Sequence, residues 1–322
     1  MISKEPLRFK PYLKSVIWGG DKICRYKKIE QPEPNIGESW EISAVPGHES
    51  VVAEGTYKGR TLIDLIAEFG SELLGESVMS RYNRKFPLLI KIIDANDNLS
   101  VQVHPDDALA KERHDSLGKT EMWYIINSDE NAKIYSGLNR EISADEYEEH
   151  IKRGDFESLL AVHDSKPGDV FFLPAGRVHA IGAGNLLAEI QESSDITYRI
   201  YDYNRRDASG KERELHTELA KDAIDYKFYK NYKSEPIPES SDDYEIAGCK
   251  HFKTRRLLVK GEKKLPLTPH SFTVLICVKG EVELEYEKGS RLLTEGHSLL
   301  LPAAMKEVKI KGVATLLLTH CP

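Results

Sequence analysis

The chain has 322 residues, 40% hydrophobic and 30% charged, a composition typical of a globular protein long enough for two domains. Its formal net charge of −7 and the lack of any Lys/Arg-rich block exclude a general polyanion-binding surface, so we expect no nucleic-acid partner. No apolar run approaches the ~20 residues of a membrane span and the N-terminus has no apolar leader, so we expect a cytoplasmic protein without membrane contacts.

The first two thirds of the chain predict a series of short strands. Runs rich in β-branched and aromatic residues are each bounded by Gly, Asp, Asn or Pro, and they lie at 87–93, 99–104, 121–126, 132–138, 169–174 and 185–193. Many short strands with irregular turns favour an antiparallel sandwich or barrel over a parallel α/β sheet.

Few helices are expected, and they are local. Thr61 and Asp64 form a capping-box pattern before an apolar stripe at helical spacing, which predicts a helix from residue 62. Ser143 begins a second helix that ends at Gly154, and a third is predicted over 217–226. Their apolar stripes indicate packing against a sheet rather than binding of a partner.

A domain boundary is predicted near residues 230–243, where prolines, serines and charges occur without periodicity. We therefore divide the chain into domains 1–235 and 236–322. The second domain continues as strands, with hairpin signals at Lys279-Gly280 and Lys288-Gly289. The four cysteines are scattered and lack paired spacing, which indicates free thiols in a reducing compartment.

The two domains share a repeated segment. "GDVFFLPAG" at 168–176 and "GHSLLLPAA" at 296–304 share the first glycine, a five-residue strand and the Pro-Ala, but the second lacks the final glycine. Extending the alignment places Glu121 opposite Phe272 and His179 opposite Glu307. Because only the first copy keeps the polar residues, we expect the first domain to carry the functional site and the second to have a structural role.

In the first copy, four side chains form a candidate metal site. Gln102 and His104 are two residues apart and therefore share one face of an extended strand. Glu121 begins the next predicted strand, and His179 follows a Pro-x-Gly turn that can direct it back over the sheet. This nitrogen and oxygen donor set suits Zn²⁺, with Mn²⁺, Fe²⁺ and Co²⁺ also feasible. Taken singly, each residue also fits a hydrogen bond at a strand end, a surface carboxylate or a turn cap.

Residues 168–179 match the second cupin motif, G-(x)5-P-x-G-x-x-H, at every fixed position. Nearly the whole chain, in order, further resembles class I mannose-6-phosphate isomerase in its short bacterial form. The resemblance rests on "IWGG" at 17–20, "GESWEIS" at 37–43, "PLLIKIIDANDNLSVQVHPDD" at 87–107, "GKTEMWYI" at 118–125, "FFLPAGRVHAIGAG" at 171–184 and "SDITYRIYDY" at 194–203.

This resemblance implies two cupin-type antiparallel β-barrel or jelly-roll domains with a few short peripheral α-helices, the second lacking metal ligands. It implies interconversion of mannose 6-phosphate and fructose 6-phosphate, a small sugar-phosphate substrate, through a cis-enediol. It also implies one Zn²⁺ per chain on Gln102, His104, Glu121 and His179. The residue that the family marks as catalytic falls on Arg199. Arg177 stands where the family often has a small residue, which predicts a different charge near the mouth of the site.

Other cations and aromatic residues complete the predicted site. Lys119, two residues before Glu121, is a second catalytic candidate, with a solvated turn lysine as the alternative. Lys91 stands within an apolar run, where an unpaired charge is costly, and this favours a substrate-binding role. Trp18, Trp40 and Glu41 are expected to line the pocket, with core packing an equal alternative for the tryptophans.

Arg199 is poorly suited to be the proton-transferring base, because the pKa of an arginine exceeds ~12. A carboxylate, a lysine and a metal-bound water all remain candidates for this base. A monomer is favoured. Two rival functions remain at this point: a cupin iron oxygenase, since two histidines and a carboxylate also form a facial triad, and a catalytically silent sugar-phosphate-binding protein.

Overall fold

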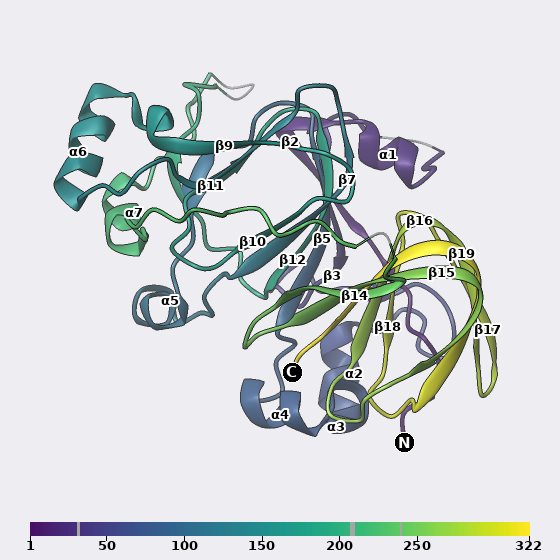
Figure 1. The fold of residues 1–322 in the computed structure, drawn as a ribbon. Helices are drawn as coiled ribbons and strands as arrows, with labels where there is room; N and C mark the ends of the chain where they lie inside the picture. Colours follow the sequence, from purple (N-terminus) through teal and green to yellow (C-terminus); the bar gives the residue numbers. More distant parts are fainter. Residues whose placement is uncertain (31–32, 207–209, 239) are drawn as a thin grey trace.

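The computed structural model describes residues 1–322 except 31–32, 207–209 and 239. The described chain is mainly β, with large antiparallel sheets and short helices, as predicted (Figure 1). The sheets are open in strand order rather than closed into barrels. None of the helices in this described part is both long and apolar enough to cross a membrane.

Two sheets that pack face to face make up the larger part of the molecule. The first has the strand order β10-β7-β12-β5-β3-β2. Its strands are β2 (Tyr12–Gly20), β3 (Ile36–Ile42), β5 (Leu88–Ala95), β7 (Glu121–Ser128), β10 (Val170–Leu173) and β12 (Asn185–Glu192). The second has the order β13-β6-β11-β8-β9. Its strands are β6 (Val101–Val103), β8 (Lys133–Leu138), β9 (Leu160–Asp164), β11 (His179–Ile181) and β13 (Tyr198–Tyr201).

The C-terminal part of the chain forms a third sheet, with the order β14-β15-β19-β16-β17 and β18 paired to β16. Its strands are β14 (Asp243–Gly248), β15 (Lys253–Pro266), β16 (Thr273–Tyr286), β17 (Gly289–Thr294), β18 (Ser298–Leu301) and β19 (Glu307–His320). The hairpin predicted at Lys288-Gly289 is confirmed, since β16 and β17 pair around it. The hairpin predicted at Lys279-Gly280 is wrong: Gly280 lies inside β16, next to an irregularity in its pairing with β19 that lets this long strand bend.

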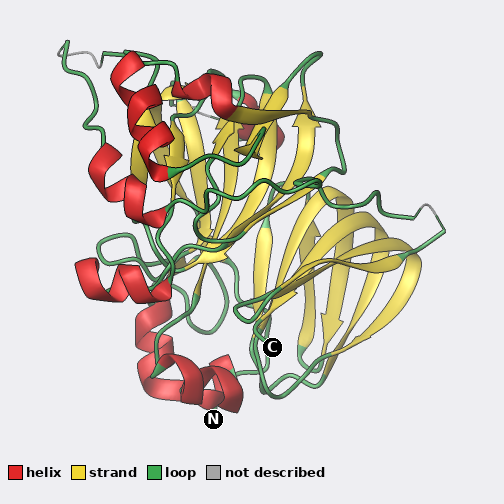
Figure 2. Cartoon of the chain, turned by 60° about the vertical axis from the view of Figure 1, so that its left-hand side comes forward, coloured by secondary structure: helices red, strands yellow, loops and turns green. Residues whose placement is uncertain are grey.

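Short helices lie mostly along one side of the strands (Figure 2). The predicted helices are confirmed as α2 (Leu62–Phe69), which carries the full capping box of Thr61 and Asp64, and α6 (Ala144–Arg153), which ends at Gly154. The third, α7 (Thr217–Ala223), is shorter than predicted. Short elements not predicted are α1 (Lys22–Tyr26), α3 (Ser71–Leu74), α4 (Glu76–Tyr82), α5 (Asp107–His114), the 3₁₀ helix η1 (Phe156–Leu159) and the strand pair β1 (Phe9–Lys10) and β4 (Val51–Val52). The strands β2, β3, β9, β11, β13 and β14 were not predicted either.

Apolar clusters bind these layers together. Ile93 and Trp123 of the first sheet pack with Ile134 and Ile181 of the second, so the core of the sandwich lies between the two sheets. The other face of the first sheet packs against α2–α4 and against the C-terminal sheet in a single cluster. Apolar burial is the main favourable term in folding, so the two predicted domains stabilise one another.

The repeated segment forms the same structure twice. The strand β10 pairs with β7, and β18 pairs with β16. In the first copy Glu121 pairs with Leu173, and in the second copy Thr273 pairs with the corresponding Leu301, so Glu121 corresponds to Thr273 and not to the predicted Phe272. His179 and Glu307 each begin a strand, which agrees with the predicted alignment. A backbone hydrogen bond of 3.0 Å closes the turn after each Pro-Ala.

The two turns differ at the glycine. Gly176 has a φ of +88°, a left-handed conformation that side chains disfavour, whereas Ala304 keeps a negative φ. The N–H of Gly176 donates to the carbonyl of His104 at 2.9 Å, so this turn joins the loops that carry His104 and His179. The glycine is therefore required by the first copy alone.

We predict that Gly176→Ala lowers the free energy of unfolding by about 1–2 kcal/mol, because the left-handed φ is unfavourable for alanine and the new Cβ would lie 3.0 Å from the carbonyl oxygen of Ala223. The matched control Ala304→Gly should lower the free energy of unfolding by about 0.5–1 kcal/mol, because a glycine raises the conformational entropy of the unfolded chain. Denaturant unfolding of the metal-free proteins measures both. Equal stability of Gly176→Ala and the parent would contradict this reading of the turn.

Candidate metal centre and active site

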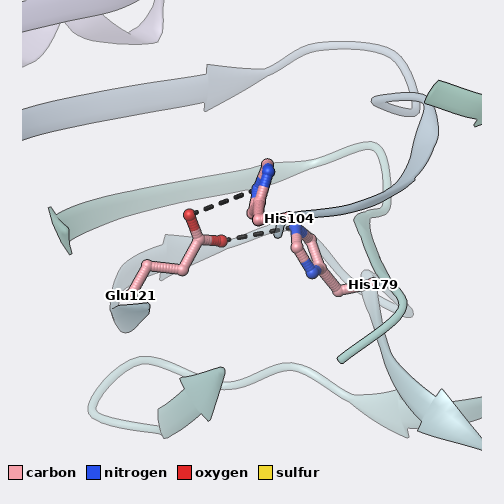
Figure 3. Close-up of side chains that lie close together, drawn as sticks. All are labelled: His104, Glu121 and His179. Atoms are coloured by element: carbon pink, nitrogen blue, oxygen red, sulfur yellow. Dashed lines mark ion pairs between the residues drawn. The ribbon is translucent and has the colours of Figure 1, made fainter. Parts of the chain in front are cut away.

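Three predicted ligands converge at one buried point. Figure 3 shows the Glu121 carboxylate facing both imidazoles, with Oε2 3.5 Å from Nε2 of His104 and Oε1 3.3 Å from Nε2 of His179. The two rings lie 4.8 Å apart between centroids. Each of the three side chains is at most 2% exposed. Atoms of these three residues lie close enough together to hold a single metal ion.

The hydrogen bonds around the imidazoles direct their free nitrogens toward this point. Nδ1 of His104 lies 3.0 Å from the carbonyl oxygen of Ile196, and Nδ1 of His179 lies 2.9 Å from that of Arg177. A carbonyl only accepts, so each Nδ1 carries the proton and each Nε2 offers a lone pair, as in metal-binding histidines. Burial lowers the pKa of His179 to about 4 and, together with the charge of Lys119, lowers that of His104, which keeps both rings neutral.

The acceptor atoms at this point fit a cation. Among the described residues, both oxygens of Glu121 and Nε2 of His179 are buried without a hydrogen-bond partner. Buried acceptors left unpaired are costly, so several of them around one point indicate a bound cation. Two imidazole nitrogens and one carboxylate are a donor set that divalent transition metals accept.

Strand pairing brings the fourth predicted ligand, Gln102, to the same place. Gln102 is the central residue of β6 and is the direct partner of His179 on β11 and of Arg199 on β13. His104 follows the end of β6 and lies on the same face, two residues on. The side chain of Gln102 lines the cavity beside the metal point. The structure therefore brings Gln102 near His104, Glu121 and His179, while its binding to a metal stays a prediction.

Lys119 lies next to the candidate metal position. Its Nζ is 3.1 Å from Nε2 of His104 and 3.3 Å from Oε2 of Glu121, and the side chain is 6% exposed. Burial raises the pKa of Glu121, while the Lys119 charge opposes that rise. Lys119 also lines the cavity, which excludes the alternative of a solvated turn lysine.

A cavity of about 380 Å³ opens beside these ligands. It has the size of a small-molecule site. Its charged lining residues are mostly cationic: Lys14, Lys91, Lys119, Arg199 and Arg213, with Glu38, Glu189 and Asp195 as the acids. Trp18 and Trp40 also line it, as predicted, although both are almost wholly buried and pack in the core as well.

One row of cross-strand neighbours forms part of the cavity wall. Trp123, Glu189, Lys91 and Trp40 are successive partners on β7, β12, β5 and β3. Lys91 Nζ lies 3.0 Å from Oε1 of Glu189, and the indole N–H of Trp123 donates to Oε2 of Glu189 at 2.9 Å. Burial alone would lower the pKa of Lys91, but Glu189 and Glu38 outweigh it and raise that pKa. The lysine is therefore a fixed positive charge.

The sequence reasoning missed Glu38 and Glu189. Glu38 Oε2 is 3.6 Å from Lys91 Nζ and accepts a hydrogen bond of 2.7 Å from the indole of Trp40. Glu38 could have been predicted from the sequence, because it lies two residues before Trp40 and therefore on the same face of the strand. Glu189, like Lys91, is a charge inside an apolar run, and antiparallel pairing of the two runs would have joined them.

Glu41, predicted to line the pocket, is placed elsewhere. It points to the opposite side of β3, where its Oε1 lies 2.7 Å from Nζ of Lys27 and accepts a hydrogen bond of 2.6 Å from Ser39. Alternation along the strand explains this, since Trp40 faces the cavity and its neighbour cannot. The structure does not bring Glu41 together with the other predicted residues.

Arg199 lines the cavity on the side of the second sheet. Its NH1 donates to the carbonyl of Glu214 at 2.8 Å, and its Nε is buried without a hydrogen-bond partner among the described residues. Burial and the neighbouring Arg213 lower the pKa of Arg199, yet an arginine stays charged. Arg213 itself is paired with Asp202. Arg199 is thus a cation with donors available to a ligand.

Arg177, expected to change the charge at the mouth of the site, does not line the cavity. Its guanidinium packs over the rings of Tyr229 and Tyr232, at 4.9 Å and 4.6 Å from their centroids. These cation–π contacts hold the charge away from the site. The contribution of Arg177 to the site is its backbone carbonyl, which orients His179.

We predict an effect of the Glu38 pair on acid stability. Burial alone would raise the pKa of Glu38, but Lys91 and Lys14 lower it from 4.5 to about 2. The unfolded chain therefore takes up this proton at a higher pH than the folded chain, so the stabilisation is present above pH 4.5 and is lost as the pH falls toward 2. Between pH 5 and pH 3 the free energy of unfolding of the parent should fall by about 2 kcal/mol more than that of Glu38→Gln.

Denaturant unfolding at several pH values measures this difference. Glu149→Gln, which alters an exposed carboxylate on α6, is the matched control and should follow the parent curve. Parallel curves for the parent and Glu38→Gln would show that the ion pair does not hold Glu38 ionised.

Comparisons with known proteins agree along the whole chain. Residues 7–133 match the model of the phosphomannose isomerase type I catalytic domain, and residues 238–321 match that of the mannose-6-phosphate isomerase cupin domain. Mannose-6-phosphate isomerase of Streptococcus mutans is 38% identical over 320 residues, covering 98% of each chain. Mannose-6-phosphate isomerase ManA of Bacillus subtilis is 36% identical over 322 residues, 99% of this chain and 100% of the relative.

The architecture agrees as well. The crystal structure of mannose 6-phosphate isomerase from Bacillus subtilis superimposes with a TM-score of 0.89 at 36% identity, covering 98% of this chain and 99% of the other. This bears out the cupin-like, mainly β fold. With sequence likeness over nearly its full length and a shared fold, the chain belongs to the type I phosphomannose isomerase family.

Proposed function

We propose that this chain is a metal-dependent aldose–ketose isomerase that interconverts mannose 6-phosphate and fructose 6-phosphate. The observation that carries the proposal is the buried cluster of His104, Glu121 and His179, with its unpaired acceptor atoms. The cluster lies next to Lys119, which lines a mostly cationic cavity. Relatives that align over the full chain bear the name of this enzyme.

We further propose that the metal is one Zn²⁺ per chain, with Gln102 as the fourth ligand. Two neutral imidazoles, a carboxylate and an amide oxygen would suit Zn²⁺. When bound, such an ion supplies a Lewis acid that polarises and orients the sugar oxygens.

The cations of the cavity have separate tasks in this proposal. Arg199 presents unpaired N–H donors and can hold an oxygen of the phosphate or of the enediolate. Lys119, between the metal ligands and the cavity, stabilises negative charge that develops on the sugar oxygens near the ion. Lys91 keeps its positive charge between Glu38 and Glu189, and the three together orient the substrate through a fixed, preorganised field.

The isomerisation moves a proton between C2 and C1 through a cis-enediol. A group that carries this proton must reach the sugar beside the metal ligands. Lys119 and Glu189 are titratable side chains that line the cavity there and are not metal ligands. We propose that the proton is carried by one of these two groups, whereas Arg199 stabilises charge.

The division into domains 1–235 and 236–322 is proposed on the same basis. The cupin model begins at residue 238, and the C-terminal sheet begins at Asp243.

That the protein is a monomer and lies in the cytoplasm stays a prediction. The four cysteines carry no disulfide.

We predict that the purified protein contains about one zinc per chain and converts mannose 6-phosphate without oxygen. Chelation should abolish turnover and added zinc should restore it, because the cluster would lose its cation. Elemental analysis and a coupled isomerase assay under anaerobic conditions measure these properties. Lack of turnover by fully metallated protein would refute the proposal, and a requirement for oxygen and iron would favour the oxygenase. Binding of substrate without solvent-proton exchange into the sugar would favour a silent binding protein.

The two copies of the repeat supply a matched pair of variants. His179→Ala should lose metal and activity, since it removes a nitrogen from the cluster. Glu307→Ala should keep both, because Glu307 is exposed on β19 and pairs with Lys264 at 2.7 Å. Metal content and turnover of the two variants are compared with the parent. Equal loss of metal in both would mean that the site has been misplaced.

A further inference from the structure

The C-terminal sheet reaches the catalytic part of the molecule through one hairpin. The strands β14 and β15 extend from this sheet toward the larger domain (Figure 1). At the tip of the hairpin lies His251, which is 5% exposed. Its Nδ1 lies 2.9 Å from Oε1 of Glu192, and its Nε2 lies 3.6 Å from Oδ2 of Asp107. The single imidazole thus lies within ion-pair distance of two carboxylates of the other domain, and within the described residues neither Nδ1 of His251 nor Oε1 of Glu192 makes a hydrogen bond.

Each of these carboxylates holds a backbone N–H beside Lys119. Oε2 of Glu192 accepts from the N–H of Thr120 at 2.8 Å, and Oδ1 of Asp107 accepts from the N–H of Gly118 at 3.2 Å. The N–H of Glu192 in turn donates to the carbonyl of Thr120 at 3.1 Å. The residues on both sides of Lys119 are therefore fixed by side chains that meet at His251.

The segment lies outside regular secondary structure, and the N–H of Lys119 itself donates to the carbonyl of Pro105 at 3.2 Å. Residues 115–120 form no helix or strand, and β7 begins only at Glu121. Within the described residues no donor hydrogen-bonds the Glu121 carboxylate, so its direction is set by the backbone and by the ion pair with Lys119. A shift of Thr120 would move Lys119 and Glu121 together.

The cluster is a bridge rather than a second metal site, although its three side chains lie close enough to hold an ion. The imidazole presents a different nitrogen to each carboxylate, whereas a metal would take one nitrogen and both carboxylates at one point. Nζ of Lys250 also lies 2.8 Å from Oδ2 of Asp107 and already supplies a positive charge there.

We infer that His251 is a positioning residue: acting through Glu192, it holds the Lys119–Glu121 segment in place for metal binding and catalysis. The C-terminal domain, which lacks the cluster of His104, Glu121 and His179, thereby contributes to the site. The inference rests on the proposed function for its catalytic part and on the metal cluster alone for its metal-binding part. Groups that orient a metal ligand from outside the coordination shell contribute about 10–100-fold in metal affinity or activity.

The test uses the full-length metallated protein and the variants His251→Ala, Glu192→Ala and the double variant. His251→Ala should lower kcat about 10-fold and speed the loss of zinc to a chelator about 10-fold, with KM changed less than about twofold because Arg199 and Lys91 are untouched. If His251 acts through Glu192, the double variant should be no worse than Glu192→Ala. His270→Ala, an exposed histidine of the same domain, is the matched control and should match the parent.

Two conservative variants separate the bridge from simple packing. His251→Asn keeps an N–H donor near the place of Nδ1, toward Glu192, and should recover most of the kcat. His251→Gln keeps one near the place of Nε2, toward Asp107, and should recover less. Thermal unfolding of every variant ensures that rates are compared well below its melting temperature.

Three results would overturn the inference. The first is a His251→Ala variant with a lowered melting temperature but the kcat and zinc-release rate of the parent. The second is equal recovery by the Asn and Gln variants. The third is a second metal in the parent that His251→Ala removes, since His251 would then be a ligand. If the parent itself fails to turn over mannose 6-phosphate, the proposed function fails, while the chelator measurement still tests the positioning of Glu121.

Discussion

The organisation of the catalytic domain follows from one buried carboxylate. Glu121 lies between two neutral imidazoles, at most 1% exposed, with no hydrogen bond to either oxygen from the described residues. A carboxylate so placed must be met by positive charge, because burying it unpaired is very costly. Strands from both sheets deliver the surrounding groups: β7 begins with Glu121, β11 begins with His179, and His104 follows β6. The sandwich thus brings its sheets together at the ligands.

Charge balance also governs the wall of the cavity. Lys91, Glu38 and Glu189 lie on the inner face of the first sheet, where apolar side chains are expected. They are tolerated because cross-strand pairing sets opposite charges beside one another. Their geometry is fixed by the hydrogen-bonded ladder, so the field that they produce is present before a ligand arrives. Such preorganised charge is worth more to catalysis than mobile side chains would be.

Much of this could be predicted from the sequence, and the limits have physical reasons. The four candidate ligands could be found because Gln102 and His104 obey the two-residue period of one strand, and because the Pro-x-Gly turn before His179 has a copy that lacks its glycine. Family resemblance added Arg199. The capping box of α2 and the Ser143 cap of α6 are local properties, and both are confirmed.

Properties that depend on pairing between distant strands were not accessible. Glu189 joins Lys91 only through the register of β12 with β5, and Glu38 only through β3. Glu41 is the direct neighbour of Trp40 and therefore points to the opposite face of β3, whereas Glu38 shares the face of Trp40. Gly280 predicted a turn because glycine is found both in tight turns and at bends in long strands, and here it lies at such a bend. His251 had no local signal, since its partners lie 59 or more positions away in the chain.

The contact between the two domains has a consequence for how the molecule folds. Phe86 of the catalytic part packs against Phe272 of the C-terminal sheet with ring centroids 4.8 Å apart, and Leu7 pairs through its backbone with Leu300. One apolar cluster contains residues of both parts, so neither can separate without exposing the core of the other. We therefore expect the chain to unfold as a single cooperative unit, in which residues near the N-terminus complete their packing only together with the strands of the C-terminal sheet.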